Sequence, residues 1–122
     1  MRKIILLFFC LVSFNVSAVE KNTTFSKEIF NKLQSEGKIV VINSWNKYCS
    51  TCTKQIKTLD KAEKEFKDII FLSYDQKNKD IAEFLKIQYR TTIVIYKNNK
   101  EVYRSMGKTK EKDIFLAIQS TI

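Results

Sequence analysis

The apolar residues of this chain follow two kinds of spacing, and together these predict its secondary structure. Continuous apolar runs rich in β-branched side chains, typical of strands covered on both faces, lie at residues 39–42, 69–72 and 93–96. Apolar side chains at helical spacing predict amphipathic helices over residues 25–33, 50–67, 81–89 and 109–122. A fourth strand is predicted over residues 102–106, after a turn at Asn98 and Asn99, which tolerate positive φ.

These elements follow the order α-β-α-β-α-β-β-α, in which two strand–helix–strand crossovers precede a hairpin and a closing helix. Gly37 can end the first helix, and Thr109 is the predicted N-cap of the last. Helices that alternate with buried strands predict an α/β fold, with the sheet between two layers of helices. No linker, repeat or low-complexity tract interrupts residues 19–122, so we expect one domain there.

The first 18 residues have the order of a secretory signal peptide. A positive start at Met1-Arg2-Lys3 precedes an apolar run from Ile4 to Phe14, and Val16-Ser17-Ala18 fits the small-x-small cleavage pattern. The apolar run is shorter than the roughly 20 residues of a membrane-spanning helix, although an uncleaved N-terminal anchor remains the alternative. Cys10 lies inside this run, where we expect only a signal-peptide residue. We therefore expect cleavage after Ala18. We also expect the protein to function outside the cytoplasm, in the periplasm or as a secreted protein, where disulfides persist.

The composition excludes several classes of catalytic and binding site. The chain has no His, which excludes Ser-His-Asp triads, Cys–His proteases and zinc sites with His ligands. It has two Gly, too few for a glycine-rich phosphate loop. Its 22 Lys and Arg outnumber 13 Asp and Glu, but the excess is mainly Lys, scattered over every segment. Because nucleic-acid readers rely on Arg forks and clustered patches, we expect a solvated basic surface and no nucleic-acid partner.

The candidate chemistry lies where the first strand meets the second helix, at Cys49-Ser50-Thr51-Cys52. At a helix N-terminus, unpaired N–H groups and the helix dipole favour a negative sulfur and lower the pKa of the first cysteine. The Cys49 thiolate can then attack a disulfide, and Cys52 can resolve the mixed disulfide that forms. The positive charge of Lys47 or Lys54 would lower the Cys49 pKa further if either side chain points inward.

The same spacing allows other uses of the two cysteines. A structural disulfide would close so short a loop that it would constrain the unfolded chain little. Zinc needs four ligands, which two thiols could supply only across a dimer. Thiolates suit copper(I), so a copper-binding pair stays open as an alternative. The strand-to-helix position favours redox chemistry, and we assign no metal site.

The segment from Val40 to Cys52, with its Trp-x-x-aromatic-Cys-x-x-Cys core, resembles the active-site segment of the thioredoxin superfamily, and most closely that of secreted TlpA-like reductases. The stretch from Lys97 to Gly107 resembles the hairpin and following glycine of that family. The resemblance implies a thioredoxin-like three-layer α/β/α sandwich with a mixed central sheet, which carries the reactive turn at its carboxyl end. It also implies a thiol–disulfide oxidoreductase with no cofactor beyond the Cys49–Cys52 disulfide.

One departure from the family concerns the cis-proline that usually faces the cysteines, since this chain has no Pro. The hairpin places that position at Thr91, or at Arg90 with TlpA-type spacing. A non-proline cis bond costs roughly 2.5–4 kcal/mol, so we expect a trans peptide. The change implies altered substrate docking and a less shielded sulfur pair, more open to metal. Thr91 could equally be a plain residue at the start of a strand.

Other positions of the resemblance carry weaker expectations. Asn43 falls where cytoplasmic thioredoxins have a buried acid, and Asn cannot titrate, so proton transfer at Cys52 would need water or another group. A hydrogen-bonded buried amide is the alternative for Asn43. Trp45 and Tyr48 are expected to form an apolar docking rim, unless they are packing residues. The middle pair, Ser50 and Thr51, is expected to tune the redox potential.

These observations predict an extracytoplasmic thiol–disulfide oxidoreductase that exchanges disulfides in exported proteins, with the direction of exchange left open. The resemblance to TlpA-like proteins implies a reductase that a membrane electron donor keeps reduced. An oxidase of the DsbA type is disfavoured, because the chain has no room for the inserted helical domain of that family. We expect a monomer. The alternative is a non-catalytic thioredoxin-like module that binds copper(I) or a partner protein.

Overall fold

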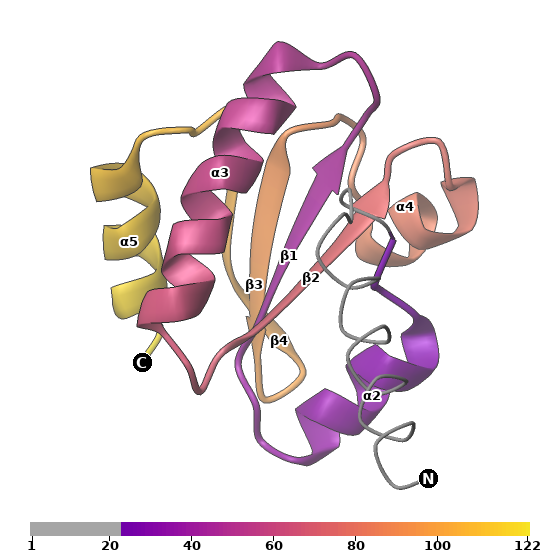
Figure 1. The fold of residues 1–122 in the computed structure, drawn as a ribbon. Helices are drawn as coiled ribbons and strands as arrows, with labels where there is room; N and C mark the ends of the chain where they lie inside the picture. Colours follow the sequence, from indigo (N-terminus) through magenta and orange to yellow (C-terminus); the bar gives the residue numbers. More distant parts are fainter. Residues whose placement is uncertain (1–22) are drawn as a thin grey trace, which may run out of the picture.

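The computed structural model describes residues 23–122 (Figure 1). The predicted signal peptide, Cys10 included, lies outside the described residues. The described part contains helices and strands in the predicted order: α2 (Lys27–Ser35), β1 (Val40–Trp45), α3 (Ser50–Glu65), β2 (Ile70–Asp75), α4 (Lys79–Leu85), β3 (Thr92–Lys97), β4 (Lys100–Met106) and α5 (Glu111–Gln119). None of the helices within residues 23–122 combines the length and the apolar character needed to span a bilayer. The α/β fold predicted from the apolar pattern is confirmed.

The strands form one mixed sheet in the order β2-β1-β3-β4. β1 pairs in parallel with β2, to which the α3 crossover connects it, and antiparallel with β3. β3 and β4 form the predicted hairpin, with Asn98 and Asn99 in its turn at φ of 53° and 64°. Asn tolerates these left-handed angles better than most residues, which explains how a chain so poor in Gly closes this turn.

The sheet separates two apolar clusters, each covered by a pair of helices. Figure 1 shows α3 and α5 on one face of the sheet and α2 and α4 on the other. Val41 of β1 packs with side chains of α3 and α5, whereas its neighbours Val40 and Ile42 pack with side chains of α2 and α4. A central strand buried on both faces explains the continuous apolar run in the sequence. The predicted three-layer sandwich with a mixed sheet is therefore confirmed.

The turn from α2 into β1 is a Schellman motif around Gly37, whose φ is 78°. The Gly37 N–H donates to the Gln34 carbonyl at 3.1 Å, and the Lys38 N–H donates to the Leu33 carbonyl at 3.0 Å. Glycine adopts this angle without the steric cost of a Cβ atom. The predicted end of the first helix is confirmed.

Two other predicted helix boundaries are wrong. Thr109 does not cap α5, which has no side-chain capping bond at its N-terminus. Its main-chain carbonyl instead accepts a hydrogen bond from the Thr58 hydroxyl of α3 at 2.8 Å. The third helix ends at Leu85 rather than near Tyr89, because Lys86 turns into the left-handed region with a φ of 57°. Tyr89 therefore lies in the loop before β3, with 61% of its surface exposed.

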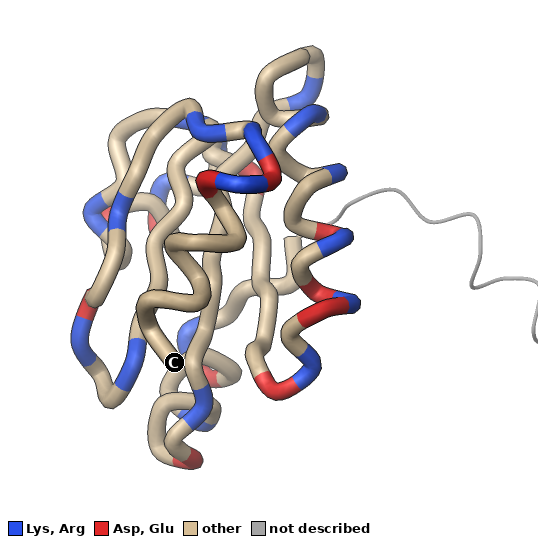
Figure 2. Tube along the Cα trace, turned by 90° about the vertical axis from the view of Figure 1, so that its left-hand side faces the viewer, with Lys and Arg blue, Asp and Glu red and all other residues tan. Residues whose placement is uncertain are grey.

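Charged residues are spread over the surface of the described part. Figure 2 shows Lys and Arg on helices, strands and loops, and along α3 they are interspersed with Asp and Glu. Within residues 23–122 the basic residues are thus scattered over the surface, as the sequence predicts.

Candidate active site

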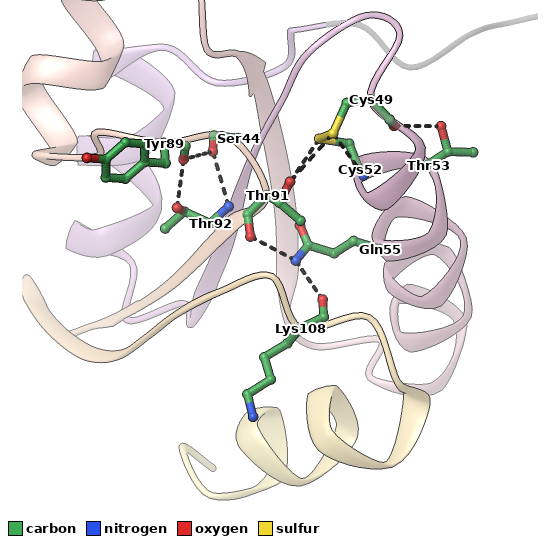
Figure 3. Close-up of a disulfide and its surroundings, with 9 residues drawn as sticks. All are labelled: Ser44, Cys49, Cys52, Thr53, Gln55, Tyr89, Thr91, Thr92 and Lys108. Carbon is green, nitrogen blue, oxygen red and sulfur yellow. Dashed lines mark hydrogen bonds between the residues drawn. A yellow bond between two sulfur atoms is a disulfide. The ribbon is translucent and has the colours of Figure 1, made fainter.

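A disulfide joins Cys49 and Cys52 at the point where the loop after β1 becomes α3 (Figure 3). Cys49 is the N-cap of α3, with extended backbone at φ −108° and ψ 105°. Its sulfur accepts a hydrogen bond from the Cys52 N–H at 3.2 Å. An N-cap sulfur lies at the positive end of the helix dipole, so the same geometry stabilises negative charge on Cys49 once the disulfide is reduced. The predicted placement of the pair at a helix N-terminus is confirmed.

The sulfur pair is well shielded. Cys49 is 6% exposed and Cys52 is 2% exposed. The Thr91 hydroxyl oxygen lies 3.1 Å from the Cys52 sulfur and 3.6 Å from the Cys49 sulfur, on the side opposite α3. The Thr91 side chain contributes to this shielding, and the expected difference from family members with a cis-proline stays a prediction. The peptide bond before Thr91 is trans, like the others in residues 23–122.

Two residues that flank the disulfide have unusual backbone angles. Tyr48, next to Cys49, has a φ of 67°, and Thr91 has a φ of 65°. A left-handed φ is uncommon outside glycine, and for a β-branched residue such as Thr it costs on the order of 1–3 kcal/mol. Such strain persists only where the surrounding structure fixes the conformation, and at Thr91 it does.

The main chain of Thr91 is held by three elements. Its N–H donates to the Ser44 carbonyl of β1 at 2.8 Å, and its carbonyl accepts from the Gly107 N–H after β4 at 2.9 Å. The side-chain amide of Gln55 on α3 donates to the same carbonyl at 3.1 Å and to the Lys108 carbonyl at 2.8 Å. Figure 3 shows Gln55 lying between the two carbonyls that it binds.

Sequence reasoning missed Gln55, which is 0% exposed. One signal could have found it. Gln55 lies three residues after Cys52 on the face of α3 that also carries the buried Leu59, so a polar side chain stands in a row of buried positions. A buried amide needs hydrogen-bond partners, which the sequence could not identify because they lie 36 and 53 residues away along the chain.

An open hollow of about 660 Å³ borders the disulfide. It brings together most of the predicted site residues, namely Tyr48, Cys49, Ser50, Thr51, Arg90 and Thr91. It also includes Tyr89 and Met106, which the sequence did not single out and which are 61% and 59% exposed. Cys49 thus borders this hollow, whereas Cys52 is not among the residues that line it.

Trp45 and Cys52 lie on a second, smaller hollow of about 310 Å³ that does not include Thr91. Trp45 is half-buried, whereas Tyr48 is 95% exposed. The Lys47 ammonium lies 5.7 Å from the centre of the Tyr48 ring, and Lys47 and Lys54 are both exposed. Neither side chain is buried, and the effect of these two charges on the Cys49 pKa stays a prediction.

Asn43 lines neither hollow. It is 4% exposed and alternates along β1 with Val41, which places its side chain on the face covered by α3 and α5. Its side-chain nitrogen has no hydrogen-bond partner within residues 23–122, and the same is true of the Trp45 indole nitrogen. The alternative of a hydrogen-bonded amide is thus not supported at this nitrogen. Among the described residues, no three Cys, Asp or Glu side chains lie close enough together to hold a metal ion.

Known proteins resemble this chain in sequence and in fold. The family model described as Thioredoxin matches residues 16–120. The H-type thioredoxin of Fagopyrum esculentum is 30% identical over 86 residues, which cover 70% of this chain and 74% of that protein. The thioredoxin of Mycoplasma genitalium is 33% identical over 93 residues, covering 73% of this chain and 87% of that protein. The crystal structure of Trxlp from Edwardsiella tarda EIB202 has the same fold, with a TM-score of 0.72, 21% identity, and coverage of 76% and 93% of the two chains.

Proposed function

This chain belongs to the thioredoxin family and is a thiol–disulfide oxidoreductase, and on that premise we propose that it works outside the cytoplasm as a reductase of disulfides in exported proteins. Cys49 is the nucleophile of this proposal and Cys52 is the resolving thiol. The TlpA-like subtype belongs to the same proposal, supported by the sequence from Val40 to Cys52.

One observation carries the assignment of roles. The Cys49 sulfur caps α3 and accepts the Cys52 N–H at 3.2 Å, and Cys49 borders the larger hollow, whereas Cys52 borders only the smaller one and is 2% exposed against 6% for Cys49. A substrate disulfide can therefore reach Cys49 first. The Cys49 thiolate attacks one substrate sulfur and releases the other as a thiolate, and Cys52 then attacks the Cys49 sulfur to release the reduced substrate.

The proposed compartment rests on the first 18 residues. Their positive start, apolar run and small-x-small ending are those of a signal peptide cleaved after Ala18. Each round of substrate reduction leaves the Cys49–Cys52 disulfide, so a dithiol donor must reduce it again. Outside the cytoplasm we assign that part to a membrane protein that carries electrons across the bilayer.

Two measurements test the proposal. The equilibrium of the purified protein with glutathione gives its reduction potential, and we expect a value nearer that of thioredoxin, about −270 mV, than that of DsbA, about −120 mV. A potential near −120 mV would contradict a reductase. Protein that holds stoichiometric copper(I) and fails to reduce insulin would favour the binding module instead.

Trapping in the native compartment identifies the substrates. The Cys52→Ala variant keeps the nucleophile but cannot resolve, so it should accumulate mixed disulfides through Cys49 with exported proteins. The Cys49→Ala variant is the matched control and should accumulate none. Trapping through Cys52 instead would reverse the assigned roles.

A further inference from the structure

We propose that the Thr91 hydroxyl is a catalytic hydrogen-bond donor to the Cys52 sulfur, and that Gln55 is the positioning residue that holds Thr91 in place. The proposal rests on the exchange chemistry of the proposed function and not on its direction or its compartment. It assigns a chemical role to a position that the sequence offered only as a docking, tuning or plain strand-start residue.

The direction of the Thr91 hydrogen bond follows from the chemistry of the disulfide. Neither sulfur of a disulfide carries a proton, so the Thr91 hydroxyl must be the donor. Its oxygen is 3.1 Å from the Cys52 sulfur and 3.6 Å from the Cys49 sulfur, which makes Cys52 the nearer acceptor. Thr91 is 5% exposed, and a hydrogen bond that is shielded from water in this way is electrostatically stronger than one in solvent.

The backbone around Thr91 fixes the position of this hydroxyl. At a φ of 65° the residue is in a region that β-branched side chains avoid, yet hydrogen bonds to its N–H and its carbonyl hold it there. Gln55 uses both N–H groups of its amide to tie the Thr91 carbonyl to the Lys108 carbonyl. The donor to Cys52 is therefore anchored to α3, the helix that carries the sulfurs.

Reduction of the disulfide by a dithiol shows what the hydroxyl does. A donor thiolate attacks the Cys49 sulfur and forms a mixed disulfide, while the Cys49–Cys52 bond breaks and its electron pair leaves on the Cys52 sulfur. The Thr91 O–H then donates to a thiolate, and this charge-assisted bond is stronger than the bond to a neutral sulfur. The second donor thiolate attacks the first donor sulfur and releases Cys49 as a thiolate. Two electrons pass to the protein, and Cys52 takes its proton from solvent.

The same hydrogen bond also acts when the protein reduces a substrate disulfide. When Cys49 carries a substrate as a mixed disulfide, Cys52 must lose its proton before it can attack. A hydroxyl aimed at the Cys52 sulfur stabilises the thiolate and raises its population. Thr91 thus favours the charged form of Cys52, and the proton that Cys52 loses passes to water.

The test compares Thr91→Val with Thr91→Ser. Valine keeps the β-branched shape and removes the hydroxyl, whereas serine keeps the hydroxyl. The oxidised proteins are mixed with dithiothreitol at pH 7, and reduction is followed by the fluorescence of Trp45, the single tryptophan of the chain. We expect Thr91→Val to be reduced about tenfold more slowly than the unmodified protein, and Thr91→Ser to stay within about twofold of it.

Two results would overturn the proposal: an unchanged rate in Thr91→Val, or equal slowing in Thr91→Val and Thr91→Ser, which would assign Thr91 to packing alone. If Thr91→Val fails to fold, Thr91→Ala replaces it and is compared with Thr91→Ser by the same criteria.

For Gln55, we expect Gln55→Met to slow reduction and to shift the pH profile of the rate. Loss of stability without either change would limit Gln55 to a structural role. An unmodified protein that dithiothreitol reduces but that leaves insulin disulfides intact would contradict the proposed function and not the role of Thr91.

Discussion

The side-chain amide of Gln55, buried on α3, donates to the main-chain carbonyl of Thr91 at 3.1 Å. This bond connects the helix that begins at the cysteines with the loop that faces them, across 36 residues of sequence. The same amide reaches the Lys108 carbonyl at 2.8 Å, so one side chain fixes both loops beside the disulfide.

Gln55→Met should therefore destabilise the fold. Methionine has a similar length and fits a buried helical position, but it leaves two carbonyls without their side-chain donor. We expect a loss of about 1–3 kcal/mol in the free energy of unfolding, measured by urea denaturation. The same substitution at the exposed Gln119 of α5 is the control and should change stability by less than about 0.5 kcal/mol. Equal effects at both positions would contradict the bridging role of Gln55.

Arg104 of β4 forms hydrogen bonds that connect the end of α4 to the sheet. Its guanidinium donates to the Leu85 carbonyl at 2.9 Å, to the Lys86 carbonyl at 3.1 Å and to both carboxylate oxygens of Glu101 at 2.7 and 2.8 Å. A cation at the end of a helix binds its free carbonyls and offsets the helix dipole. We expect Arg104→Ala to cost about 1–2 kcal/mol of unfolding free energy, by urea denaturation. Arg104→Lys keeps the charge without the planar fork and should recover only part of the loss; full recovery would show that charge alone suffices.

Glu101 makes a small part of the stability depend on pH. The hydrogen bond from Arg104 holds the pKa of Glu101 below its usual value, with the charges of Arg104 and Lys86 adding to the effect. A lowered pKa in the folded state gives stability that is present above the unfolded pKa, about 4.3, and is lost as pH falls through the folded pKa. Glu101→Gln should therefore be less stable than the unmodified protein at pH 7, and the difference should shrink below about pH 4. A difference that stays constant from pH 7 to pH 3 would contradict this sign.

Lys86 offers a way to stabilise the fold. It ends α4 in the left-handed region at a φ of 57°, where glycine has no steric cost, and its side chain is exposed. We expect Lys86→Gly to raise the free energy of unfolding by about 0.5–1 kcal/mol, after the greater flexibility of glycine in the unfolded chain is counted. The thermal midpoint should rise accordingly. Lys77→Gly, at an exposed turn residue with negative φ, is the control and should lower it slightly.

The sequence predicts those parts of the molecule that local pattern determines. Continuous apolar runs such as Val40–Ile42 identify a strand buried on both faces, and the Cys-x-x-Cys spacing after such a strand places two sulfurs at a helix N-terminus. The Schellman turn at Gly37 can also be predicted locally, because glycine is the residue type that adopts a φ of 78° without steric cost.

The parts that the sequence does not predict depend on contacts between distant segments. The Thr91 hydroxyl meets the sulfurs only because β3 lies beside β1, and Gln55 finds its acceptors only in the folded chain. Thr109 looks like a helix cap in sequence, but its carbonyl is committed to Thr58 of α3. The shielding of the sulfurs also depends on the contact with Thr91, which the absence of a proline in the sequence does not reveal.

The reactivity of Cys49 is tested most directly by its alkylation as a function of pH. The Cys52→Ala variant isolates Cys49 and keeps the backbone N–H at position 52 that its sulfur accepts. Iodoacetamide labelling of Cys49, followed by mass spectrometry of the peptide that contains it, gives the pH at which half of the thiol is ionised. A sulfur stabilised by the α3 N-terminus should reach that point at least about one unit below the ordinary cysteine value of 8.5. A midpoint near 8.5, with the labelling rate of an ordinary exposed thiol, would contradict a nucleophile activated by the helix.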